Sequence, residues 1–158
     1  MNLCEFPKKT KFQLLYRASE DGFNSANFHD KCDGIKNTLT IVKSRNCSIF
    51  GGYTGAAWKS NGCWMNDRNS FIFSLVNHLN DSFKAKCTNN QYSIFGDSSF
   101  GPKFGKGADL FISSNSNTNH RSYSNFGHSY KHGTYGQTVL DGSKSFQTTE
   151  IEVFEKLN

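Results

Sequence analysis

The fold is decided between residues 38 and 53, where the chain reads Thr38-Leu39-Thr40-Ile41-Val42-Lys43-Ser44, then Arg45-Asn46-Cys47, then Ser48-Ile49-Phe50-Gly51-Gly52-Tyr53. β-Branched residues in near alternation with others are typical of a strand that buries one face. The polar interval between the two runs is short enough to join neighbouring antiparallel strands. These residues therefore predict a β-hairpin.

Further segments with strand character flank this hairpin. Residues 12–18 form a short aromatic run that ends at a turn over residues 19–22. Residues 70–76 are apolar on both faces, which predicts a central strand, and residues 83–87 can pair with it. Residues 54–68 are expected to be a connector. Shorter strand candidates follow over residues 92–96, 108–112, 123–130 and 146–154, and the glycine-rich residues 100–107 lie between the first two.

The C-terminal segment has the cleanest alternation in the chain. Ile151 and Val153, with Thr149, fall on one side, and Glu150, Glu152 and Phe154 fall on the other. Because successive side chains of a strand point to opposite faces, both carboxylates lie on the same side.

A single short helix is predicted over residues 25–32, with Phe28 and Cys32 one turn apart, Asn24 or Ser25 as the N-cap, and Asp33-Gly34 as the stop. Many short strands with one or two short helices predict a mainly β chain (α+β), built as a two-sheet antiparallel β-sandwich flanked by short helices. The residues expected to form its core are Phe50, Phe71, Phe73, Phe95, Phe111 and Ile151.

Composition limits the classes of function. The 158 residues fit one domain, and 35% hydrophobic residues can form a core. No apolar run approaches the roughly 18 residues of a membrane span, so none is expected. The net charge is +5, but the excess of basic residues is distinct only near the start of the chain, where Lys8, Lys9 and Lys11 form a short cluster. The aromatic residues lie mostly in predicted strands with apolar neighbours. We therefore expect no binding to nucleic acid.

Neither a cofactor nor a metal site is expected from the motifs. Residues 96–107 are rich in glycine but lack the spacing of a phosphate-binding loop. His120, His128 and His132 lie in a segment whose residues do not favour the helix that would align two imidazoles.

The five cysteines are odd in number and contain no Cys-x-x-Cys, so reduced thiols are expected. A cytoplasmic location is expected because the sequence shows neither an apolar span nor the pattern of a secretory signal. A thiol-dependent antioxidant enzyme is the alternative function. It would need an accessible, activated cysteine, and Cys47, beside Arg45, and Cys63 are its candidates because both fall in predicted turns.

Several stretches, in this order, resemble the TLDc domain, the module of oxidation-resistance proteins. They are residues 14–23, 28–34, 38–44, 49–54 with Trp58, 70–75, 92–96, 104–110, 126–130 and 146–154. The resemblance runs from about residue 10 to 156. It implies an N-terminal extension over residues 1–9, a TLDc-like domain over residues 10–156, and a β-sandwich.

The same resemblance implies what the chain does. It indicates a non-enzymatic protein-interaction module, without a cofactor, that is implicated in protection from oxidative stress and binds or regulates the vacuolar proton-pumping ATPase. It also implies a monomer in the cytoplasm, or at the periphery of endolysosomal or vacuolar membranes through a partner.

The family's recurrent glycines and acidic C-terminal strand mark candidate binding residues. They are Gly51, Gly96, Gly107, Asp109, Gly127, Glu150 and Glu152. For the two glutamates three roles stay open: a solvated strand face, an anchor for a neighbouring loop through backbone N–H groups, or a contact with a basic partner surface.

Overall fold

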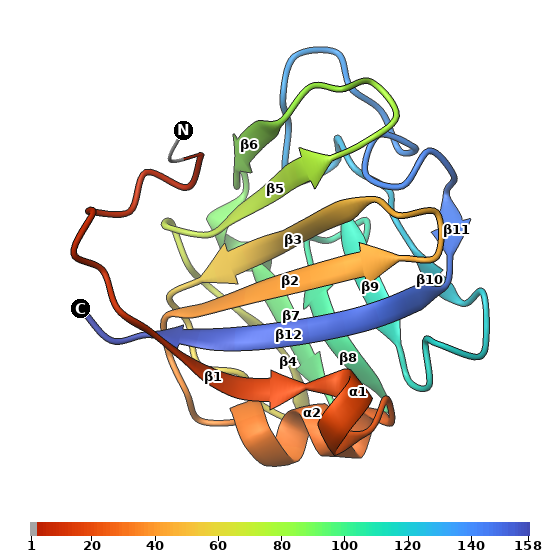
Figure 1. Ribbon diagram of the computed structural model, residues 1–158. Coiled ribbons are helices and arrows are strands. Elements are labelled where there is room, and N and C mark those ends of the chain that lie inside the picture. Colours follow the sequence, from red (N-terminus) through yellow and green to blue (C-terminus); the bar gives the residue numbers. More distant parts are fainter. Residues whose placement is uncertain (1–2) are drawn as a thin grey trace.

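Two six-stranded antiparallel sheets are stacked in the computed structural model, which describes residues 3–158 (Figure 1). The first sheet has the order β1-β12-β2-β3-β5-β6. Its strands are β1 (Phe12–Arg17), β2 (Thr38–Ser44), β3 (Ile49–Thr54), β5 (Phe71–Val76), β6 (Phe83–Lys86) and β12 (Thr148–Lys156). The C-terminal strand β12 thus lies inside this sheet, between β1 and β2.

The second sheet has the order β11-β10-β9-β8-β7-β4 and lies behind the first in Figure 1. Its strands are β4 (Asn61–Met65), β7 (Ile94–Asp97), β8 (Phe100–Phe104), β9 (Leu110–Ser113), β10 (Ser122–Tyr123) and β11 (Ser145–Phe146). The predicted two-sheet antiparallel β-sandwich is confirmed.

Helices are few and short. α1 (Ala18–Asp21) and α2 (Ser25–Cys32) lie at one end of the sandwich, and a 3-10 turn, η1, spans Asn90–Tyr92 (Figure 1). The bounds predicted for α2 are confirmed, and Asn24 is its N-cap, with Oδ1 accepting the N–H of Ala26 at 3.0 Å. The turn expected after the first strand is the single helical turn α1 instead.

The predicted hairpin is β2–β3, in which Val42 pairs with Phe50. The pairing expected between residues 70–76 and 83–87 is that of β5 with β6. Two expectations were wrong. The connector predicted over residues 54–68 contains β4, and of the strand predicted over residues 123–130 only Tyr123 is extended in a sheet.

The main core lies between the two sheets. It includes Phe50 and Ile151 as predicted, together with Val42, Ile72, Ile94, Phe104, Leu110, Ile112, Tyr130 and Val153. Phe71 and Phe73 are buried too, but they belong to a separate cluster with Tyr53 on the outer face of the first sheet. Leu3, Cys4 and Phe6 pack on that cluster, so the start of the described chain covers part of this face.

Phe95 and Phe111 were wrongly predicted to be core residues. Both are partly exposed on the outer face of the second sheet, while their neighbours Ile94 and Leu110 are fully buried. Adjacent residues of a strand point to opposite faces, so only one of two adjacent apolar side chains can face the other sheet.

Candidate functional site

The seven candidate binding residues do not form one site. Gly51 lies in β3 and Gly96 in β7, which belong to different sheets. Gly107, Asp109 and Gly127 come together in the loops around the start of β9. Glu150 and Glu152 lie on β12. The structure therefore places them in separate regions of the sandwich.

The two strand glycines allow close packing. A Cβ at Gly51 would lie 1.9 Å from the carbonyl oxygen of Thr40 and 2.9 Å from Cζ of Phe73. A Cβ at Gly96 would lie 2.1 Å from the carbonyl oxygen of Lys59. Real Cβ atoms do not approach other atoms this closely, so both positions require glycine for packing.

Asp109 is fully buried and binds a run of backbone N–H groups. Its Oδ2 accepts the N–H of His128 at 2.9 Å, Ser129 at 2.9 Å and Tyr130 at 3.0 Å, and its Oδ1 accepts that of Ser129 at 3.0 Å. Burial raises the pKa of Asp109, and these N–H groups oppose the shift. The carboxylate thus fastens residues 128–130 to the start of β9.

Gly107 and Gly127 complete this loop junction. A Cβ at Gly107 would lie 2.9 Å from Cβ of His128, so the two loops touch directly. Gly127 has a φ of 100°, a left-handed conformation that favours glycine. Asn125 adds a hydrogen bond from its Nδ2 to the carbonyl oxygen of Gly107 at 2.6 Å. These three features hold the loop at Gly107 and the loop at residues 125–128 in place.

The glutamates on β12 are both engaged within the chain. Glu150 Oε1 accepts the backbone N–H of Ser19 in α1 at 3.1 Å, which is the contact expected of a loop anchor. Glu152 Oε1 accepts Nε–H of Arg17 at 2.8 Å, and Arg17 also pairs with Glu20 at 3.2 Å. These contacts tie β12 to β1 and α1.

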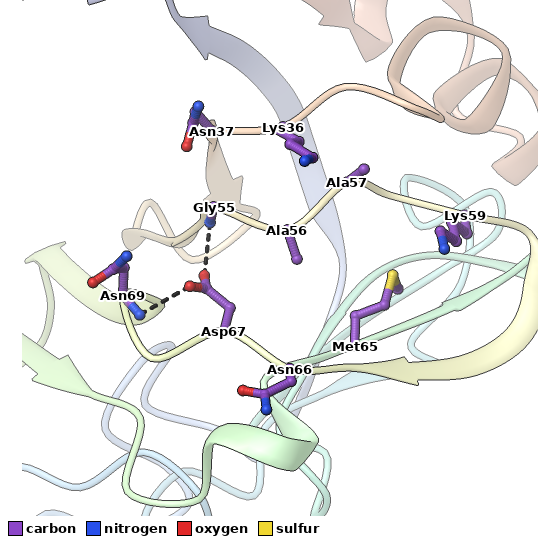
Figure 2. Close-up of a pocket in the computed structure, with 10 residues that line it drawn as sticks. All are labelled: Lys36, Asn37, Gly55, Ala56, Ala57, Lys59, Met65, Asn66, Asp67 and Asn69. Atoms are coloured by element: carbon purple, nitrogen blue, oxygen red, sulfur yellow. Dashed lines mark hydrogen bonds between the residues drawn. The ribbon is translucent and has the colours of Figure 1, made fainter.

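A cleft of about 480 Å³ opens beside the start of β2 (Figure 2). The residues lining it are Lys36, Asn37, Gly55, Ala56, Ala57, Lys59, Met65, Asn66, Asp67 and Asn69. Asp67 is its buried acid, and Oδ2 accepts the N–H of Gly55 at 2.6 Å while Oδ1 accepts that of Asn69 at 2.9 Å. The carboxylate therefore holds two loops together, and two lysines border the cleft. Sequence reasoning missed it because three separate segments build it.

An apolar groove of about 220 Å³ lies on the outer face of the first sheet. Its lining residues are Phe12, Leu39, Ile41 and Phe154, from β1, β2 and β12. We call these four residues the outer apolar strip. Phe6 contacts the ring of Phe12 at a centroid distance of 5.3 Å, so the strip continues from the face covered by the N-terminal residues.

The cysteines differ in exposure: Cys32 is buried, Cys4 and Cys87 are partly buried, and Cys47 and Cys63 are exposed. Burial raises the pKa of Cys32 well above its ordinary value and also raises that of Cys4. Of the two candidates for a reactive thiol, Cys47 lies in the loop between β2 and β3 as predicted, whereas Cys63 was wrongly predicted to lie in a turn and lies in strand β4. Over residues 3–158, no group of three or more His, Cys, Asp or Glu side chains is placed to hold a metal ion.

None of the helices within residues 3–158 has both the length and the apolar character needed to cross a membrane. No curated protein matches the sequence. The TLDc domain does match it, over residues 1–156 of the 158. The predicted resemblance is confirmed, and the chain belongs to the TLDc domain family.

Proposed function

We propose that this chain is a non-enzymatic protein-interaction module that takes part in protection from oxidative stress and that binds or regulates the vacuolar proton-pumping ATPase. The observation that carries the proposal is the TLDc match over residues 1–156, because this family is linked to oxidation resistance. As a module it would act through a surface held in place by its rigid scaffold.

The structure offers surface suited to such contacts. The outer apolar strip keeps Phe12 at 38% exposure, and Leu75, Val76 and Leu79 at the β5–β6 turn are each more than 40% exposed. Large apolar side chains grouped on a surface favour protein association, since burying them against a partner removes them from water. These patches support an interaction role.

The proposal is tested by affinity capture from a lysate of the source cell, with the tagged chain as bait. Subunits of the vacuolar proton-pumping ATPase should be enriched over a bait consisting of the tag alone. A second bait, an unrelated β-sandwich of similar size and charge, controls for non-specific retention. Equal recovery of pump subunits on all three baits would contradict the proposal.

A further inference from the structure

Six aromatic residues form a continuous row across the outer face of the second sheet. In order they are Tyr92, Trp64, Phe95, Phe100, Phe111 and Tyr123, and successive ring centroids are 5.2, 5.0, 6.0, 4.9 and 5.0 Å apart. We call them the aromatic row. All six side chains are partly exposed. The row therefore crosses five strands, from β4 to β10, and meets solvent along its length.

Lys103 lies at the centre of this row. It pairs with Phe111 across β8 and β9, and its Nζ lies 4.8 Å from the ring centroid of Phe95 and 5.3 Å from that of Trp64. None of the ion pairs found within residues 3–158 includes Lys103. Burial lowers the pKa of Lys103, and the nearby Asp97 carboxylate opposes this shift.

A second cation borders the row. Arg121 lines a hollow of about 190 Å³ with Phe100, Phe111 and the serines Ser99, Ser113 and Ser114. The Arg121 side chain is exposed, and it too is absent from the ion pairs within residues 3–158. At the other end, Lys106 Nζ lies 4.4 Å from the ring centroid of Tyr92. Cationic side chains thus lie beside the aromatic row near both of its ends and at its centre.

The position of the Lys103 ammonium over the rings distinguishes between two possible anionic ligands, single-stranded nucleic acid and an acidic protein segment. Single-stranded nucleic acid binds aromatic residues by stacking bases on open ring faces. Here one ammonium lies over the rings of Trp64, Phe95 and Phe100, so those faces are already occupied. Aromatic residues and arginine are also enriched where protein interfaces bind most strongly. The arrangement therefore favours an acidic protein segment.

We infer that the aromatic row docks an extended acidic segment of a protein partner. Carboxylates of the segment pair with Lys103 and Arg121, and its apolar side chains cover the neighbouring rings of Phe111 and Tyr123. Complementary charge of this kind gives specificity and fast association. The inference rests on the proposed role in protein binding, but it does not require that the partner be the proton pump.

The test is a fluorescence anisotropy titration of the purified chain with a short labelled peptide of repeating Glu-Glu-Leu-Leu, which in extended form presents glutamate and leucine in turn on each face. We expect saturable binding that Lys103→Gln and Arg121→Gln each weaken about tenfold, because each removes one charge pair. Lys103→Arg should retain binding, since it keeps the charge. Lys43→Gln is the matched control, because Lys43 is exposed on the first sheet, and it should bind like the parent.

Thermal unfolding of each variant establishes that it is folded. Arg121→Gln alters an exposed side chain, so it decides the question if Lys103→Gln does not fold. Equal binding by Arg121→Gln and Lys43→Gln would overturn the inference. So would equal binding of the glutamine counterpart of the peptide, or tighter binding of single-stranded oligothymidylate. Pump capture is a separate measurement, so failure of one proposal is distinguishable from failure of the other.

Discussion

The ring of Phe104 lies directly against Gly52: a Cβ at that position would come within 2.6 Å of Phe104 Cζ. On the opposite face of β3, the neighbouring Gly51 lies beneath Phe73 in the same way. The glycine pair therefore lets two large rings pack on the two faces of one strand. One ring belongs to the core between the sheets, and the other belongs to the outer cluster.

We predict that Gly52→Ala destabilises the protein by about 1–3 kcal/mol, the usual cost of overfilling a packed core. Phe104 is fully buried and cannot move away freely. The measurement is urea denaturation. Gly136→Ala is the matched control, because a Cβ there meets nothing within 4 Å. Equal urea midpoints for the two variants would contradict this prediction, because they would show that a Cβ against Phe104 does not lower the free energy of unfolding.

Replacing Asp109 should loosen the loop junction. In Asp109→Asn, the amide Nδ2 replaces one of the two oxygens that accept backbone N–H groups, so two donors then face each other. Leaving a buried donor unpaired costs about 1–3 kcal/mol. Hydrogen exchange at the amides of residues 128–130 reports the loss directly. Asp30→Asn, at an exposed position of α2, should leave both stability and exchange unchanged.

The two glutamates of β12 should affect stability rather than partner capture. Glu150→Gln weakens the contact with the N–H of Ser19, and Glu152→Gln removes the ion pair with Arg17. Each should lower Tm by about 2 °C, since the contacts are partly exposed. Pump capture should match that of the parent. A variant with parental Tm but weaker capture would instead show a direct contact with a basic partner surface.

The limits of sequence reasoning are visible in particular elements. The β2–β3 hairpin and α2 could be predicted because alternation, a short polar interval and a capping Asn are local signals. β4 could not, because Asn61–Met65 has no alternation and acquires its partner β7 only through the fold. Phe95 shows the same limit, since two adjacent apolar residues do not reveal which one faces the core.

The candidate site was harder to predict than the fold. Glycines such as Gly51 and Gly96 mark places where chain segments approach closely, and a sequence cannot tell such packing from a binding role. The cleft at Asp67 and the aromatic row each combine segments that are distant along the chain. Which residues meet in each of them depends on the order of strands within the sheets and on the pairing of strands that are distant in sequence, such as β4 with β7.

Thiol reactivity should follow burial. We expect iodoacetamide at pH 7.5 to label Cys47 and Cys63 within minutes, while Cys32 stays unmodified until the protein unfolds. Burial raises the pKa of Cys32, and the thiolate is the reactive form. Beyond the single oxidation of its exposed thiols, the parent should consume peroxide no faster than the variant with all cysteines replaced by serine. Catalytic turnover that only the parent shows would establish the antioxidant enzyme instead.

The most direct measurement is a binding titration of the purified chain against the purified peripheral sector of the vacuolar proton-pumping ATPase. We predict a saturable complex, unaffected by replacement of all five cysteines with serine, because the proposed function uses no thiol chemistry. Absence of a complex at roughly 100 μM of either component, where even weak specific pairs associate, would contradict the account.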